Sequence, residues 1–127
     1  MSERDPHTGQ FVLDQLQRFG SHLDRTHEVT FWLYFPSEEA SQGAAARARH
    51  AGLHPEVSPP LSDEPDRLWL CLLSLPHIPD ETILDGIFDF CEQLALAFDG
   101  KFDGWESSIE LDEEELQQGL SGLYSGQ

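Results

Sequence analysis

The stretch His27-Glu-Val-Thr-Phe-Trp-Leu-Tyr-Phe35 decides the fold of this chain. One set of alternate positions is purely apolar: Val29, Phe31, Leu33 and Phe35. The other set is mixed: Glu28, Thr30, Trp32 and Tyr34. Alternation with a period of two is typical of a strand that buries one face in a core. We therefore predict a strand over these nine residues, ended by Pro36.

The segment that follows predicts a helix and then a short strand. Ser37 is a preferred N-cap residue, and Glu38 lies where the helix dipole favours an anion. Gly52 provides the stop signal. The next strand, Leu53 to Val57, contains Pro55 and therefore suits an edge of a sheet. A proline-rich loop, residues 58–66, follows it.

The second half of the chain repeats this order of elements. Arg67 to Leu75 is apolar on both faces, which favours a central strand. Asp80 is a candidate cap for a long helix that reaches Phe98 with an apolar stripe at helical spacing. Phe102 to Leu111 is the predicted last strand.

A helix from Phe11 to Phe19, with Gly20 as its cap, precedes all of these elements. The order is a helix followed by β-α-β-β-α-β, the split unit of ferredoxin-like folds. Right-handed crossovers place its first and third strands, here the most apolar, in the centre. We predict an α+β, ferredoxin-like antiparallel sheet with an additional N-terminal helix. The expected organisation is a flexible leader (residues 1–10), the domain (residues 11–111) and a loose acidic tail (residues 112–127).

Length and charge restrict the function. The chain has 127 residues, which suits one domain, and carries 24 acidic and 7 basic residues for a net charge of −17. Such a field repels nucleic acids and anionic membranes, so the predicted partner is a basic protein. The polar stretch 1–10 and the lack of a long apolar run predict a cytoplasmic protein with no membrane segment.

Carboxylates gather in two parts of the chain. One group lies on the predicted third helix: Glu81, Asp85, Asp89 and Glu92. The other follows it: Asp99, Asp103, Glu106, Glu110, Asp112, Glu113, Glu114 and Glu115. Like charges four residues apart on a helix cost a few tenths of a kcal/mol each. Two interpretations stay open, a merely solvated face and a docking surface for a cationic partner.

Aromatic residues beside these carboxylates provide candidate contacts. Phe102 and Trp105 are three residues apart, so a regular strand would place them on opposite faces. Gly104 permits a bulge, which would bring both rings to one face, either for a partner or for packing. Trp32 and Tyr34 lie opposite the apolar face of their strand, where they meet either the first helix or a partner. The predicted partner-binding residues are Trp32, Asp103, Trp105 and Glu106.

No residue set in the chain predicts catalysis. The six histidines do not have metal-binding spacing, and no phosphate loop or nucleophile motif occurs, so we expect no metal, no cofactor and no enzymatic activity. Cys71 and Cys91 lie in apolar runs, which favours two packed thiols in a reducing compartment. A disulfide between them stays open at this point.

Together these features resemble the regulator of ribonuclease activity B family of ribonuclease E inhibitors. The resemblance spans Phe11 to Leu111 and rests on four stretches: Phe19-Gly20-Ser21, Leu53 to Val57 after Gly52, Ala97-Phe98-Asp99, and Phe102-Asp-Gly-Trp105. It implies a bacterial protein that inhibits RNA decay by binding the scaffold portion of an endoribonuclease, without catalytic residues of its own. The proline-rich loop 58–66 and a shorter acidic tail depart from the family.

Two alternatives remain beside this hypothesis. An immunity-type inhibitor that mimics nucleic acid shares the acidity but competes with substrate at an active site. A small-molecule-sensing domain shares the β-α-β-β-α-β order but responds to a metabolite rather than to a protein.

Overall fold

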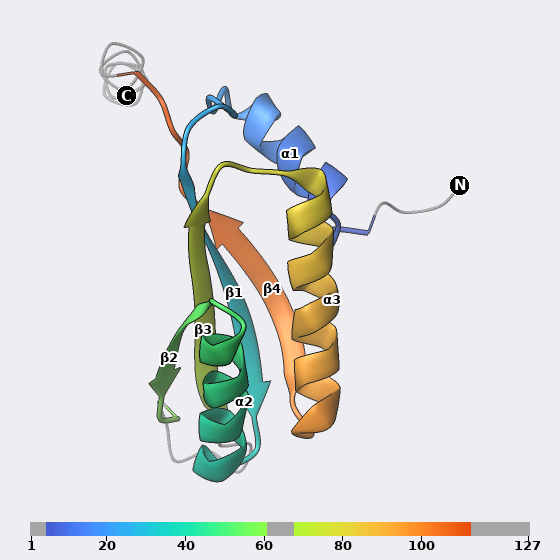
Figure 1. Ribbon diagram of the computed structural model, residues 1–127, viewed down its shortest axis with the longest axis vertical. Coiled ribbons are helices and arrows are strands. Elements are labelled where there is room, and N and C mark those ends of the chain that lie inside the picture. Colours follow the sequence, from blue (N-terminus) through green and yellow to red (C-terminus); the bar gives the residue numbers. More distant parts are fainter. Residues whose placement is uncertain (1–4, 61–67, 113–127) are drawn as a thin grey trace, which may run out of the picture.

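The computed structural model describes residues 5–60 and 68–112, and all structural statements concern these residues. Figure 1 shows helices packed on one twisted sheet. In chain order the elements are α1 (Gly9–Arg18), β1 (His27–Phe35), α2 (Glu38–His50), β2 (His54–Ser58), β3 (Trp69–His77), α3 (Glu81–Ala97) and β4 (Lys101–Ser107). This confirms the predicted order of elements.

The four strands form one antiparallel sheet in the order β2-β3-β1-β4. The two strands predicted to be central, β1 and β3, pair along their whole length, from His27 opposite His77 to Phe35 opposite Trp69. The proline-containing strand β2 lies at one edge, as its sequence predicted. The architecture is therefore α+β, with a strand order compatible with a ferredoxin-like fold.

Side chains cap all three helices. Ser37 accepts a hydrogen bond from the N–H of Ala40, and Asp80 accepts one from Ile83, as predicted. Thr8 caps α1 by accepting from the N–H of Phe11 at 3.1 Å. Helix α1 therefore begins inside the stretch that the sequence suggested as a leader.

The core lies between the helices and one face of the sheet. From β1 this face contributes the apolar set predicted by the alternation, and each of these side chains is fully buried: Val29, Phe31, Leu33 and Phe35. Helix α3 contributes the largest helical share: Leu84, Ile87, Phe88, Cys91, Leu94 and Ala95. Val12, Leu16 and Phe19 have the spacing of one helical face, but only Val12 and Leu16 of these three are buried, and Phe19 is 66% exposed.

Three strands differ from their predicted bounds. Strand β2 is shifted by one residue and covers His54–Ser58 rather than Leu53 to Val57. Strand β3 extends through Pro76, which pairs with Glu28 of β1 and lies beyond the residues that β2 contacts. Strand β4 ends at Ser107 rather than at Leu111. There the N–H of Glu28 donates to the hydroxyl of Ser108 rather than to a backbone carbonyl, so the regular ladder of backbone hydrogen bonds ends. The chain then turns toward the residues that follow α1.

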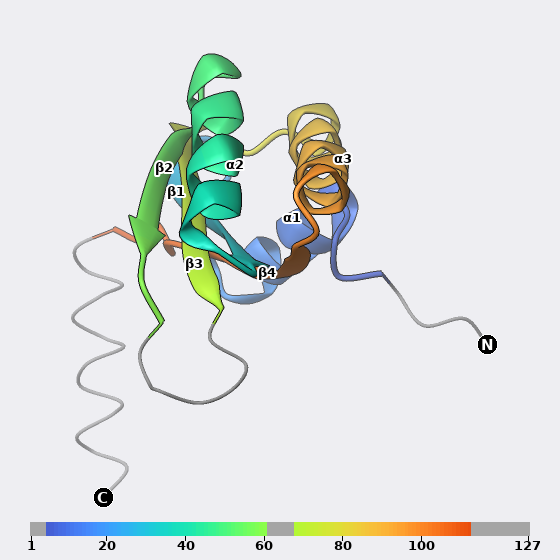
Figure 2. The ribbon, with the colours of Figure 1, turned by 90° about the horizontal axis from the view of Figure 1, so that it is seen from below.

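Helix α1 lies on the same side of the sheet as α2 and α3 (Figure 2). It packs on the start of α3, where the N–H of Gly9 donates to the Asp85 carboxylate at 2.7 Å. A side chain at Gly9 would collide with the backbone of Glu81, so this contact needs glycine. The possibility that α1 covers Trp32 on the other face of the sheet is therefore excluded, because tertiary packing places the helix elsewhere.

We expect Gly86→Ala to raise the free energy of unfolding by about 0.5–1 kcal/mol, because glycine is a poor helix former in the middle of α3. A Cβ atom at Gly86 would meet nothing within 4 Å. Urea denaturation measures the change. Gly100→Ala is the matched contrast, since its Cβ would lie 2.5 Å from the carbonyl oxygen of Tyr34, and we expect it to destabilise. An unchanged or lower stability of Gly86→Ala would contradict the prediction.

Candidate functional site

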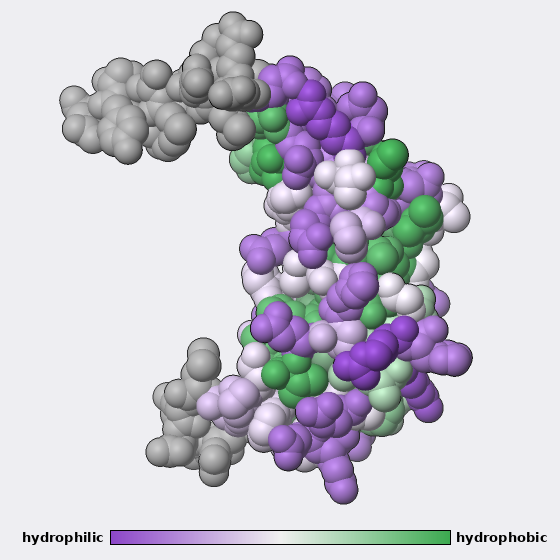
Figure 3. Space-filling view, turned by 60° about the vertical axis from the view of Figure 1, so that its left-hand side comes forward, coloured by the Kyte–Doolittle hydropathy of each residue, from purple (hydrophilic) through white to green (hydrophobic). Residues whose placement is uncertain are grey.

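The candidate site is the face of the sheet turned away from the helices, which we call the open face. The register places these residues on it: Glu28, Thr30, Trp32, Tyr34, His54, Glu56, Ser58, Leu70, Leu72, Ser74, Lys101, Gly104 and Glu106. Figure 3 turns the left-hand side of Figure 1, where β2 lies, toward the reader. Green hydrophobic surface lies among the purple polar residues in this view.

Strand pairing orders the open face into rows across the sheet. The central row is Glu56, Leu72, Trp32 and Gly104, and the next row toward the end of β1 is Ser58, Leu70, Tyr34 and Lys101. Trp32, Tyr34, Leu70 and Leu72 are half-buried, although no described helix covers them. The face therefore has an aromatic and aliphatic centre.

A β-bulge shapes the side of the open face formed by β4. Trp32 is opposite Gly104 whereas Leu33 is opposite Phe102, so Asp103 is the additional residue in β4. The bulge brings Phe102 and Trp105 to the same face of the sheet, which confirms the prediction made for this segment.

Both rings of the bulged segment pack toward the helices. Phe102 contacts Phe31 and Phe88 at centroid distances of 6.4 and 5.9 Å. Trp105 meets Phe11 of α1 edge to face at 6.5 Å. Its indole N–H donates to the carbonyl of Pro6 at 2.8 Å. These contacts are those expected of the packing alternative.

The structure thus separates the four predicted partner-binding residues. Trp32 and Glu106 lie on the open face in neighbouring rows, because Glu106 pairs with Thr30. Asp103 is exposed at the bulge of the edge strand. Trp105 lies on the opposite face, so it does not share a surface with Trp32. Sequence reasoning missed Glu56, because only the pairing of β2 with β3 shows that it lies in the row of Trp32.

Carboxylates surround the apolar centre of the open face. The exposed acidic residues there are Glu28, Glu56, Asp103 and Glu106. In the part of the chain that the structure describes, none of their carboxylates has a hydrogen bond or an ion pair. By contrast, Asp112 binds Arg25 and lies 3.5 Å from His22. The open face therefore combines apolar surface with unneutralised negative charge.

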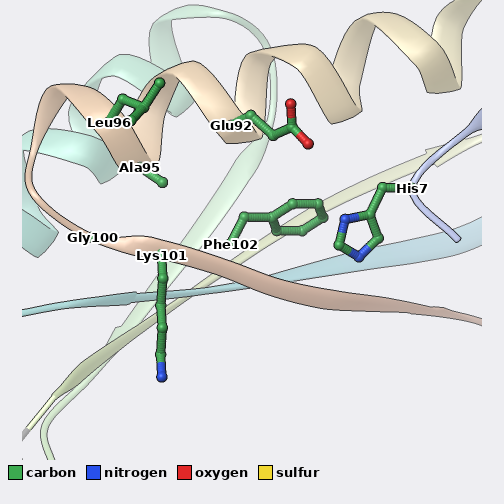
Figure 4. A pocket seen from close by; sticks show the side chains of 7 residues that line it. All are labelled: His7, Glu92, Ala95, Leu96, Gly100, Lys101 and Phe102. Atoms are coloured by element: carbon green, nitrogen blue, oxygen red, sulfur yellow. The ribbon is translucent and has the colours of Figure 1, made fainter. Parts of the chain in front are cut away.

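A second surface is the hollow between α3 and β4, with a volume of about 330 Å³ (Figure 4). Its lining is His7, Glu92, Ala95, Leu96, Gly100, Lys101 and Phe102. The His7 ring lies 4.4 Å from the ring of Phe102 and stacks on Phe88 at 5.6 Å. The N-terminal segment thereby packs against one end of the hollow. No group of three metal-ligating side chains occurs there or elsewhere within residues 5–60 and 68–112.

A buried histidine and serine pair joins the loops at one end of the sheet. The Nε2 atom of His27 lies 2.6 Å from the hydroxyl of Ser21, and its Nδ1 atom lies 2.8 Å from the carbonyl of Arg25. Since a carbonyl only accepts, Nδ1 donates and Nε2 accepts from the serine. The Ser21 oxygen also accepts from the N–H of Glu110. With His27 fully buried and no carboxylate behind it, the pair is structural and does not form a nucleophile site.

The two cysteines are free and buried, which confirms the prediction of packed thiols. Burial raises the pKa of Cys71 to about 11. Burial, with smaller contributions from Cys71 and Glu92, raises the pKa of Cys91 to about 12. Because only the thiolate is nucleophilic, neither cysteine is suited to chemistry at neutral pH.

Fold and surface define a ferredoxin-like α+β domain with one covered and one open sheet face. Residues 7–107 match the family described as Regulator of ribonuclease activity B, and the chain belongs to that family. The family comprises regulators of ribonuclease rather than enzymes. A search of curated proteins found no match. Within the described residues, no helix is long and apolar enough to cross a bilayer.

Proposed function

We propose that this chain regulates RNA decay by binding a ribonuclease as a protein ligand, with its carboxylates docked on a cationic segment of the enzyme. Membership of the ribonuclease-regulator family carries the proposal. The net charge of −17 supports it, because a binding site for a polyanion requires basic side chains, and this chain has only 7 Lys and Arg against 24 Asp and Glu. The partner we propose is the basic scaffold portion of ribonuclease E or of a similar bacterial endoribonuclease, in the cytoplasm.

Binding rather than catalysis fits the described residues. The Ser21–His27 pair is closed to solvent, and the thiols are protonated at neutral pH. The exposed carboxylates lie beside apolar surface, so electrostatic attraction guides the encounter and burial of apolar area holds the complex. A regulator of this kind needs no cofactor.

We expect the chain to bind the isolated basic scaffold of such a ribonuclease and to bind it more weakly as salt rises. Exposed charges are screened within roughly 10 Å at 0.1 M salt, so a titration from about 0.05 to 0.5 M should lower the affinity progressively. Isothermal titration calorimetry with the scaffold and, separately, with the catalytic domain measures this. The regulatory effect is measured as the rate at which the complete ribonuclease cleaves an RNA with and without this chain.

Three outcomes would contradict the proposal. An affinity that is unchanged across the salt series would remove its electrostatic basis. Binding to the catalytic domain in competition with RNA would favour a nucleic-acid mimic. A thermal shift with a metabolite, without binding to any part of the ribonuclease, would favour a sensing domain.

A further inference from the structure

We propose that the open face is the docking surface and that Trp32 stacks on an arginine side chain of the partner, with the guanidinium held by acidic residues at the rim. The inference rests on the proposed function for the identity of the partner. The preference for arginine is argued separately, from the residues of the open face.

Trp32 occupies the centre of the open face, where it is half-buried. Its cross-strand neighbour on β3 is Leu72, and its neighbour on β4 is Gly104, which has no side chain. Within the described residues, the Trp32 indole has no ring contact, cation contact or hydrogen bond. Trp105 differs, because its ring and its N–H are both engaged.

The fold itself does not require glycine at position 104. The positive-φ glycines of the described residues are Gly20 and Gly52, so Gly104 has a backbone that other residues adopt. A Cβ atom there would meet nothing within 4 Å. Glycine in a strand costs about 0.5–1 kcal/mol relative to alanine, and it often marks a close approach of another molecule. The missing side chain leaves space beside Trp32 for an occupant.

The neighbouring row of the open face shows which kind of group suits the space beside Trp32. Tyr34 occupies the same face one row along, and its cross-strand neighbour on β4 is Lys101. The Nζ atom of Lys101 lies 5.7 Å from the centre of the Tyr34 ring, a cation–π contact within the chain. Trp32 offers the better aromatic platform for a cation, and its neighbour on β4 is Gly104, which supplies no cation.

Carboxylates on both edge strands near the central row select the occupant. Glu56 ends the row on β2, and Glu106 lies two residues from Gly104 on the other edge strand. Neighbouring strands lie roughly 4.8 Å apart, so a long cationic side chain on Trp32 reaches either carboxylate. Arginine fits better than lysine because its planar guanidinium stacks on a ring and binds a carboxylate at the same time.

The test uses the full chain with two probes of equal length and charge, an oligo-arginine peptide and an oligo-lysine peptide. We expect the arginine peptide to bind more tightly. The chain has three tryptophans, so two-dimensional NMR resolves three indole N–H signals, and that of Trp32 should move most. Trp32→Ala should weaken binding roughly three- to thirty-fold, the range that corresponds to one cation–π contact.

A gap-filling variant tests the same idea without removing a packed aromatic residue. Gly104→Leu places a side chain in the space beside Trp32 and should weaken arginine-peptide binding to a similar extent at an unchanged Tm. Gly86→Leu is the matched control, because a Cβ at Gly86 also meets nothing within 4 Å and the residue lies on α3, in the opposite layer. We expect this control to bind the peptide normally.

The possible results separate this inference from the proposed function. If the arginine peptide binds at Trp32 but the ribonuclease scaffold does not bind, the surface stands and the proposed partner is wrong. If the scaffold binds and folded Gly104→Leu binds it equally well, the docking surface is wrong and the function stands. Equal affinity for the two peptides, RNA binding at Trp32, or a monomer–dimer change in Gly104→Leu would each overturn the arginine proposal.

Discussion

Replacing Phe31 by alanine should lower the free energy of unfolding by about 3–5 kcal/mol, the usual cost of emptying a large aromatic site in a core. The Phe31 side chain is fully buried at the centre of the covered sheet face. It meets Phe88 edge to face at 5.4 Å and Phe102 at 6.4 Å, so the substitution removes contacts to α3 and β4 together. Urea denaturation followed by circular dichroism measures the loss.

Phe19→Ala is the matched control for this experiment. Phe19 is the same residue type but is 66% exposed at the end of α1, so removing its ring leaves no cavity in the core. We expect a change within about 0.5 kcal/mol, as is usual for surface positions. Equal losses for the two variants would mean that the assigned core is wrong.

Alkaline unfolding is the second large effect that we expect. The pKa of Cys71 is about 11 and that of Cys91 about 12, both raised above the ordinary value of 9.0 by burial. Above pH 9 the unfolded chain therefore loses thiol protons that the folded chain keeps. Stability is fully present below pH 9 and falls as the pH rises through the folded values, by at most about 1.4 kcal/mol per pH unit for each thiol.

The measurement is urea denaturation at several pH values between about 8 and 10.5, compared with the double variant Cys71→Val, Cys91→Ala. The double variant retains every other titratable group of the chain, so the comparison isolates the two thiols. Its stability should therefore depend less steeply on pH. A slope identical to that of the unchanged chain would show that the buried thiols do not cause the effect.

The aromatic residues of β1 and β4 are divided between the two faces of the sheet, and this division separates packing from the proposed binding. Phe102 and Trp105 hold the N-terminal segment and α1 against the sheet. Trp32 and Tyr34, on the other face, contribute little to the core and are available to a partner. The proposed docking on the open face would leave the core undisturbed, so it requires no change of fold on binding.

Local signals in the sequence were strong enough to predict most elements. The alternation over His27–Phe35 predicted β1 to the residue, and the caps Ser37 and Asp80 predicted the starts of α2 and α3. Gly104 predicted the bulge in β4. The end of β4 was missed, because Ser108 ends the ladder through a hydrogen bond to Glu28, a residue far away in sequence.

The sequence by itself determined the strand and helix order, the core face of β1 and the excess of negative charge, because these depend on side-chain period, caps and composition. Only the tertiary structure decided that α1 packs on α3, that Trp105 lies opposite Trp32, and that Glu56 and Gly104 border Trp32. These facts depend on strand register and helix packing between segments far apart in the chain. Such contacts are set by the fit of whole surfaces, which no local pattern records.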